Sequence, residues 1–198
     1  MIKGENHPLS SPLSGKVRKE RDFLGEREMS DEFYFGINTL RAVENFNISG
    51  VPLSHFPAII EAFAAIKMAA ARSNSELKII SAKIEKAIVQ ACQDLMDGKF
   101  KTHFVVDMIQ GGAGTSTNMN ANEIIANRAL EILGHEKGLY RFCHPNNHVN
   151  ASQSTNDVYP SAIKIALINC NKKLIQILDL LISAFRNKAV EFKDIIKM

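Results

Sequence analysis

Two segments of the chain combine hydroxyl and amide side chains with a complete lack of charge. The first is MIQGGAGTSTNMNAN, between Asp107 and Glu123, and the second is FCHPNNHVNASQSTN, between Arg141 and Asp157. Each segment ends where a helix is predicted to begin. A helix N-terminus presents free backbone N–H groups and a partial positive charge, and glycines let that backbone approach an anion closely. Two such ends lying together would suit a small molecule with two carboxylates.

The side chains at these two helix starts have two interpretations. They are hydrogen-bond donors for a ligand in the first interpretation: Thr115, Ser116, Thr117 and Asn118 at one terminus, and Ser154, Thr155 and Asn156 at the other. They are helix caps in the second, because Ser, Thr, Asn and Asp are the preferred N-cap residues. Ser154-x-x-Asp157 and Asn120-x-x-Glu123 both resemble capping boxes. Residue type alone leaves both interpretations open.

Other ligand classes have weaker patterns in this chain. Gly112-x-Gly114 follows an apolar run, as in a dinucleotide fingerprint, but Thr117 stands where the third glycine belongs. A Gly-Lys-Ser/Thr phosphate loop is absent from the sequence. Three residues of types that bind metals lie close together: Cys143, His144 and His148. No second Cys or His pair stands at the spacing of a zinc site, which favours ordinary loop residues. We therefore predict no metal and no cofactor.

Arg27 and Arg41 flank the turn-rich region near the start of the chain and are candidate anion-binding residues. The alternative for each is a solvated or ion-paired arginine.

Composition excludes several broad classes of protein. The 198 residues are 45% hydrophobic and 23% charged, which rules out wholesale disorder. No apolar stretch approaches the ~18–20 residues of a membrane span, and the net charge of +3 is not gathered into a phosphate-binding block. Three scattered cysteines do not form a disulfide framework. We predict a cytoplasmic chain with no nucleic-acid and no membrane partner.

The elements that must position these residues are mostly helical. Residues 1–20 have no period and are predicted to be a disordered tail, while 22–50 contain turns and one short hairpin. Apolar periodicity predicts helices over 57–74, 81–97 and 119–133. The second of these is capped by Ser81 and ends before Gly98. The first is expected to bury one stripe: Ile59, Phe63, Ile66 and Ala70.

The last predicted helix, over 155–197, differs from the others. Leucines and isoleucines repeat there at intervals of seven, as in Leu167, Leu174 and Leu181. Pro160 is tolerable only in the first turn of that helix. Its apolar surface is too wide for a single seam, so the helix is expected to be buried on more than one side. No other segment is long enough to cover it, which indicates an incomplete helical bundle.

Two long motifs carry a resemblance to a known family. Residues 110–138 (QGGAGTSTNMNANEIIANRALEILGHEKG) and 144–166 (HPNNHVNASQSTNDVYPSAIKIA) resemble the aspartase/fumarase superfamily, most closely its aspartate ammonia-lyase branch. FLGEREM (23–29) and YFGINTLRAVENF (34–46) resemble the amino-terminal region of the same family. Fumarases have Ser-Gly-Thr and Ser-Ser-Asn where this chain has Ala113-Gly114-Thr115 and Ser154-Thr155-Asn156.

The resemblance implies a mainly α fold with minor β structure. It places a small amino-terminal helical domain over 21–153 and the first long helix of a central helical bundle over 154–198. Family members are homotetramers whose active sites draw residues from three subunits. The implied reaction is anti elimination of ammonia from L-aspartate to give fumarate. The residues implied to bind substrate are Thr115, Asn118, Ser154, Thr155 and Asn156, and Arg27 and Arg41 match arginines near the family's site.

The chain also departs from the family. Asn147 replaces the usual Asp of a loop that forms a secondary anion site in fumarases. The family's substrate-facing His and the loop with its serine base would lie beyond Met198, so the isolated chain is expected to be inactive. Two alternatives remain open: a fumarate hydratase of the same superfamily, and a noncatalytic fragment that associates with lyase subunits through its long helix.

Overall fold

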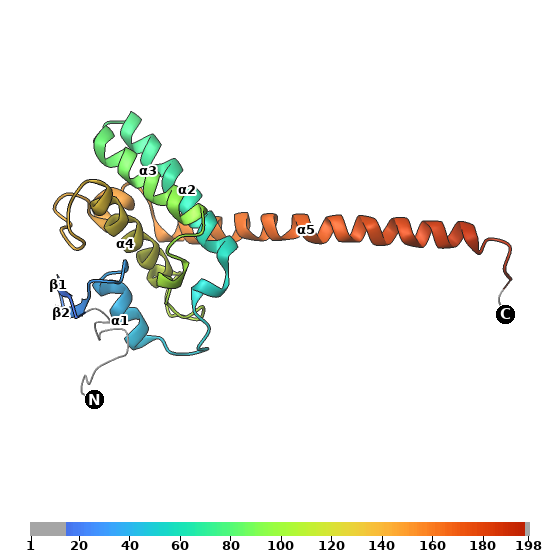
Figure 1. Cartoon of the computed structure of the whole chain (residues 1–198), viewed down its shortest axis with the longest axis horizontal. Helices are drawn as coiled ribbons and strands as arrows, with labels where there is room; N and C mark the ends of the chain where they lie inside the picture. The colour runs from blue at the N-terminus through green and yellow to red at the C-terminus, as the bar shows by residue number, and fades with distance from the viewer. Residues whose placement is uncertain (1–14, 197–198) are drawn as a thin grey trace.

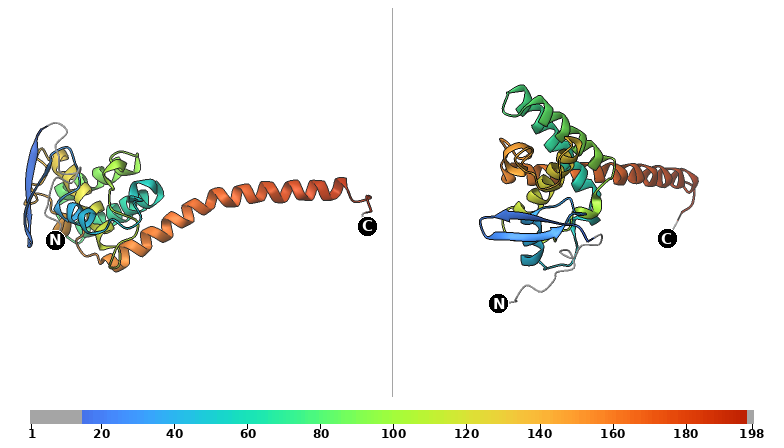
Figure 2. Two further views of the ribbon diagram at one scale, coloured as in Figure 1. Left: turned by 90° about the horizontal axis from the view of Figure 1, so that it is seen from below. Right: turned by 60° about the vertical axis from the view of Figure 1, so that its left-hand side comes forward.

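The protein is mainly α-helical, with one two-stranded antiparallel sheet. A computed structural model describes residues 15–196. The hairpin strands are β1 (Val17–Asp22) and β2 (Gly25–Ser30), and the helices are α1 (Ile37–Asn45), α2 (Pro57–Glu76), α3 (Ala82–Met96), α4 (Thr115–Ile132) and α5 (Thr155–Glu191). Three short helical turns connect them: η1 (Leu53–His55), η2 (Lys101–His103) and η3 (Pro145–Val149). The hairpin and α1–α4 gather at one end, and α5 projects away from them (Figures 1 and 2).

The hairpin begins earlier than predicted, so the predicted disordered tail is wrong for residues 17–20. These residues form most of β1, which pairs with β2 so that Val17 lies opposite Ser30. The buried guanidinium of Arg18 donates to the main-chain carbonyls of Ser30, Phe33 and Phe35. These hydrogen bonds fix β1 against the end of β2 and the segment that follows it. The rest of the predicted tail, residues 1–14, lies outside the described residues.

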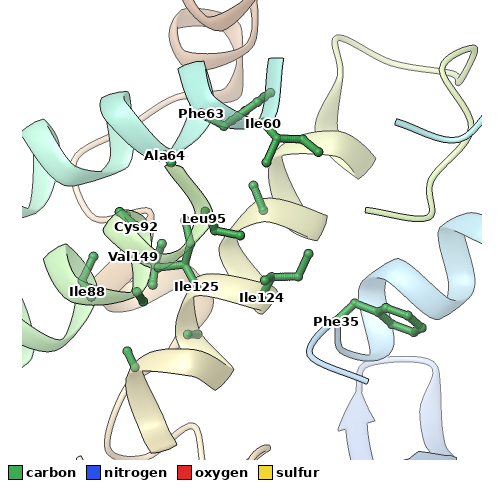
Figure 3. Close-up of a cluster of buried hydrophobic side chains, with 14 of the residues drawn as sticks. Phe35, Ile60, Phe63, Ala64, Ile88, Cys92, Leu95, Ile124, Ile125 and Val149 are labelled. Carbon is green, nitrogen blue, oxygen red and sulfur yellow. The ribbon is translucent and has the colours of Figure 1, made fainter. Parts of the chain in front are cut away.

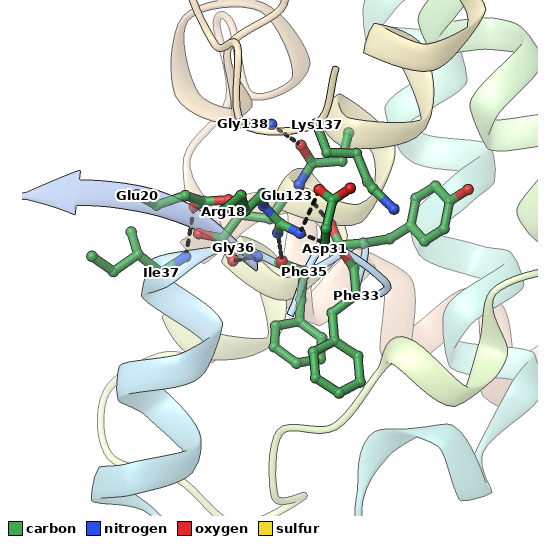
Figure 4. Close-up of polar contacts among 12 residues, drawn as sticks. Arg18, Glu20, Asp31, Phe33, Phe35, Gly36, Ile37, Glu123, Lys137 and Gly138 are labelled. Carbon is green, nitrogen blue, oxygen red and sulfur yellow. Dashed lines mark hydrogen bonds and ion pairs between the residues drawn. The ribbon is translucent and has the colours of Figure 1, made fainter. Parts of the chain in front are cut away.

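The carboxylate of Glu123 joins α4 to the start of α1 (Figure 4). It accepts hydrogen bonds from the backbone N–H groups of Gly36, Asn38 and Thr39, at 2.8–3.1 Å. The predicted Asn120-x-x-Glu123 capping box is therefore wrong, because Glu123 caps α1 rather than its own helix. Burial raises the pKa of Glu123, and the neighbouring Glu20 raises it further.

Helices α2 and α3 form as predicted, within two residues at each end. The Ser81 hydroxyl accepts the Ile84 N–H, and Gly98 has the positive φ of a helix-ending glycine, +87°. The predicted stripe of α2 is displaced, since only Phe63 among its four residues is fully buried. The buried face runs instead through Ile60, Phe63, Lys67, Ala71 and Asn74. The polar members of that face meet the chain segment that follows η3.

Helix α4 begins at Thr115, four residues before the predicted start. It crosses the core among the apolar side chains of α2 and α3 (Figure 3), and about two thirds of its residues are buried. Three residues of its predicted apolar face, Ala121, Ile125 and Ala129, have 0% exposure, whereas Ile132 is exposed. The helix ends before Gly134, as the sequence indicates.

Helix α5 ends at Glu191, six residues before the predicted end. Pro160 is its sixth residue, beyond the first turn in which the sequence placed it, so the Asn156 carbonyl lacks the usual helical N–H donor. Every α5 residue from Leu167 onward is exposed in the single chain. Within residues 15–196, no helix is both long enough and apolar enough to cross a membrane.

Candidate functional site at the start of α4 and α5

The N-termini of α4 and α5 lie side by side, as the two donor-rich segments suggest. The Asn118 side-chain amide, in the first turn of α4, donates to the Thr155 hydroxyl at the first residue of α5, with 3.0 Å between Nδ2 and Oγ1. Asn118 is buried and Thr155 half-buried, whereas Thr115, Ser154 and Asn156 are exposed. Segments about forty residues apart in sequence thus form one polar surface.

A cavity of about 430 Å³ lies beside this junction. The glycine-rich loop forms one wall, and the first two turns of α5 form the other. Asn156 is the predicted substrate-binding residue that lines it. The full lining is Met108, Ile109, Gln110, Gly112, Ala113, Gly114, Asn156, Tyr159 and Pro160. No Lys, Arg, Asp, Glu or His occurs in this set of described residues, so charge for an anionic ligand must come from backbone dipoles or from other segments.

Gly114 holds the loop close to α5. Its φ of +83° is a conformation that residues with a Cβ rarely adopt. An added Cβ would also lie 2.4 Å from the Tyr159 ring. Because Gly114 is the N-cap residue of α4, this end of the helix has no side-chain cap from its own N-cap position.

Gln110 caps α4 instead, a role that the sequence analysis missed. Its side-chain oxygen accepts the Thr117 N–H at 3.0 Å, and its amide nitrogen donates to the Thr117 hydroxyl at 2.7 Å. Thr115 and Asn118 are therefore not needed as caps. At α5 the capping interpretation is correct for Ser154, whose hydroxyl accepts the Asn156 N–H at 3.2 Å.

Asp107 anchors the segment that leads into the glycine loop. Its carboxylate accepts the backbone N–H groups of Ser49 and Gly50 and the Ser49 hydroxyl, all within 2.8 Å. The hydroxyl bond, together with the backbone N–H of Ile109, holds the pKa of this carboxyl well below its usual range. The charged carboxylate therefore fixes the position of the wall formed by 108–110.

A second set of polar side chains lies behind the junction, and the sequence analysis did not assign it to the site. We call it the amide cluster: Asn118, Asn122 and Asn150. The Asn150 side-chain oxygen accepts hydrogen bonds from both other amides and from the Lys67 ammonium of α2. Lys67 interrupts the otherwise apolar stretch 62–71 of α2, and that interruption was the available signal.

Arg27 and Arg41 are ion-paired at the hairpin, the alternative left open above. Arg41 makes a two-bond contact with Asp22, at 2.6 and 2.8 Å, and Arg27 lies 3.0 Å from Glu44. Neither lines the cavity beside Asn156. Arg41 instead shares a separate hollow of about 540 Å³ with residues that include Ser116 of α4.

The Cys143–His148 segment makes local hydrogen bonds, in agreement with the loop-residue interpretation. The His144 ring accepts backbone N–H groups at the start of η3, and the His148 ring accepts the His144 N–H at 2.8 Å. Cys143 is buried. Residues 15–196 contain no group of three or more His, Cys, Asp or Glu side chains arranged to hold a metal ion.

Comparison with known proteins identifies the family of this chain. A protein-family model described as "Lyase" matches residues 25–198, nearly the whole chain. The chain is 56% identical over 182 residues to an aspartate ammonia-lyase of Helicobacter pylori strain J99. The chain belongs to the aspartase/fumarase lyase superfamily. The Helicobacter alignment covers 92% of this lyase chain but 39% of the relative, so the chain spans about two fifths of that relative's length.

Solved structures agree with this assignment. The lyase chain matches the crystal structure of a "fumarate lyase:delta crystallin" from Brucella melitensis with a TM-score of 0.89 and 52% identity, over 93% of this chain and 43% of that one. A class II fumarase from Schistosoma mansoni matches with a TM-score of 0.68 and 37% identity, over 76% of this chain and 32% of the fumarase. An aspartate ammonia-lyase of Escherichia coli K12 is 46% identical over 94% of this chain and 39% of its own length.

Proposed function

We propose that this chain supplies the carboxylate-binding part of an aspartate ammonia-lyase, a carbon–nitrogen lyase that removes ammonia from L-aspartate to give fumarate. The observation that carries the proposal is the junction of the α4 and α5 N-termini at Asn118 and Thr155, in a chain 56% identical to an aspartate ammonia-lyase. Helix N-termini favour anions through their free N–H groups and dipoles. L-aspartate and fumarate each carry two carboxylates, and the junction has two such termini.

In this proposal Thr115 and Asn118 bind the side of the substrate with the distal carboxylate, and Ser154, Thr155 and Asn156 bind the carboxylate and amino groups. Elimination requires a base for the C3 proton and stabilisation of the charge that develops beside the carboxylate. Among the described residues that line the cavity, Tyr159 is the only titratable side chain. In this proposal the base and most of the positive charge come from other parts of the complete enzyme.

The nearest alternative is a fumarate hydratase, which would add water rather than ammonia to fumarate. Two observations favour the ammonia-lyase: 46–56% identity to aspartate ammonia-lyases against 37% to the Schistosoma fumarase, and Thr155 at the position where fumarases have Ser. Products separate the two, because fumarate with ammonium gives L-aspartate in one case and L-malate in the other.

The test is a chimera in which this chain replaces the matching segment of the Helicobacter pylori enzyme. We expect it to release fumarate from L-aspartate, followed by ultraviolet absorbance. Thr155→Ala or Asn156→Ala should lower kcat/KM about ten- to hundredfold, because a hydrogen bond to a charged group contributes ~1.5–3 kcal/mol. Ser161→Ala, an exposed hydroxyl two turns along α5, is the matched control. If both site variants keep the parental kcat and KM, these residues only begin the helix and do not bind substrate.

We also propose a quaternary arrangement for the complete protein. In it, residues 21–153 form an amino-terminal domain, 154–198 begin a central bundle, and four copies assemble in the cytoplasm. The exposed apolar surface of α5 supports this arrangement, because it requires cover from other helices. The same surface supports the second candidate function, a noncatalytic chain that docks on lyase subunits.

A further inference from the structure

Lys67 is a fully buried amine in the middle of α2, with 0% exposure. Its Nζ lies 2.8 Å from the Asn150 side-chain oxygen, the one acceptor found for it among the described residues. None of the described carboxylates lies within 4.0 Å of it. Burial lowers the pKa of Lys67 to about 7, so the amine changes charge near neutral pH.

A continuous path of hydrogen bonds connects this amine to the proposed substrate site. The Asn150 oxygen that accepts from Lys67 also accepts from the Asn118 amide at 3.1 Å and from the Asn122 amide at 3.2 Å. The same Asn118 amide donates to the Thr155 hydroxyl at 3.0 Å. The charge of Lys67 therefore acts on the acceptor that orients Asn118, and Asn118 orients Thr155.

The amide cluster is not saturated with hydrogen bonds. The side-chain oxygens of Asn118 and Asn122 are buried and have no donor among the described residues, and the same holds for Gln153. A charged lysine has three N–H donors, of which Asn150 satisfies one. Buried polar groups in a purely structural role are almost always paired. The free oxygens of this cluster can therefore accept a further donor, and the free N–H groups of Lys67 can donate to a further acceptor.

Resting on the function proposed above, we propose that Lys67 is a positioning residue for carboxylate binding. As a cation it holds Asn150 and, through Asn118, the Thr155 hydroxyl, and a dicarboxylate bound at the α4–α5 junction favours that cation. Cys92 of α3 is the described titratable group that couples to Lys67, and burial raises the pKa of this thiol to about 12. The Cys92 thiol is therefore neutral across the neutral pH range, while α4 and the segment after η3 present amides to Lys67.

The sign of the effect follows from linkage. An anion that favours charged Lys67 raises the amine's pKa in the complex above its value of about 7 in the free protein. Substrate binding then takes up a proton between these two pKa values and weakens as pH rises through that window. The weakening is about tenfold in affinity for each pKa unit by which the ligand raises the amine.

The experiment measures KM and kcat of the chimera across about pH 6 to pH 9. We expect the KM of the parent for L-aspartate to rise by about tenfold above about pH 7, a rise that Lys67→Met should not show. The pH dependence of kcat should be the same in the parent and in Lys67→Met. Lys67→Met is expected to have a raised KM at low pH and to lack this limb of the profile. Arg72→Met, which removes an exposed cation from the same helix, should keep the parental profile.

A second measurement tests the proposal even if the Lys67→Met protein fails to fold. It is calorimetry of fumarate binding to the parent in two buffers of different ionisation enthalpy. Net proton uptake near pH 7.5 supports the proposal, and its absence overturns it. A Lys67→Met enzyme with the parental pH profile of KM also overturns it. A parent that forms no fumarate from L-aspartate overturns the function itself, which separates the two failures.

Discussion

The exposed apolar stripe of α5 should make this chain associate. Three adjacent Leu-Ile pairs repeat every seven residues, and their side chains are 45–59% exposed in the single chain: Leu167, Ile168, Leu174, Ile175, Leu181 and Ile182. Polar residues three or four apart occupy a separate stripe: Asn169, Lys172, Gln176, Asp179, Ser183 and Arg186. The perturbation is the double substitution Leu174→Glu with Leu181→Glu, which places two carboxylates in the apolar stripe.

The magnitude follows from the exposures. Full burial of a Leu or Ile side chain contributes ~1.5–3 kcal/mol, so covering the exposed half of each of six contributes roughly 5–9 kcal/mol in total. That sum is comparable with the stability of a whole domain, ~5–15 kcal/mol, and with the entropic cost of association, ~4–15 kcal/mol. Losing two of the six, and placing charge at the interface, should raise the dissociation constant by about a hundredfold or more.

The assay is light scattering across a concentration series, with circular dichroism to verify that α5 is helical. We expect the parent to form oligomers and the double variant to dissociate at higher concentration. Gln176→Glu with Ser183→Glu adds the same charge to the polar stripe and should leave association unchanged. A helical parent that stays monomeric at every concentration, with little binding of a hydrophobic dye, would refute the reasoning.

Three further predictions concern the site and the core. Gly114→Ala should destabilise the chain by ~2 kcal/mol or more in urea unfolding, whereas Gly112→Ala should cost only ~1–2 kcal/mol. Both glycines have φ of +83°, but only at Gly114 would the Cβ meet a ring, so equal losses would contradict the clash. Folding lowers the pKa of Lys67 from 10.5 to about 7, so the unfolded chain binds more protons than the folded one between about pH 7 and 10.5. The free energy of unfolding therefore rises with pH in that range. Lys67→Met should flatten this rise in unfolding curves measured at several pH values. The purified 198-residue chain should form no fumarate from L-aspartate, and fumarate growing in proportion to added protein would place the base within it.

Local patterns in the sequence were sufficient for most of the helices. Ser81 and Gly98 bound α3 because capping and positive φ depend on neighbouring residues alone. The start of α4 was misplaced because its cap, Gln110, lies outside the helix and replaces the expected side chains. The predicted tail was wrong over 17–20 because β1 is stabilised by partners distant in sequence, including the carbonyls that accept from Arg18.

The buried face of α2 could not be read from hydropathy. Periodicity assigns apolar residues to the core, yet Lys67 and Asn74 are buried there because the segment after η3 supplies Asn150 and a main-chain carbonyl as acceptors. Glu123 was assigned to the wrong helix for the same reason, since its five donors come from the start of α1. Burial of a polar group depends on a partner, and that partner is many residues away.

The sequence by itself determined the helical class, the two uncharged donor-rich segments and the apolar excess of α5, because each is a property of composition and spacing along a short stretch. Only the tertiary structure decided that Asn118 meets Thr155, that Arg27 and Arg41 are neutralised by carboxylates, and that a buried lysine lies behind the junction. These are pairings between groups far apart in the chain, and hydrogen bonds and ion pairs act only over the few ångströms that folding creates.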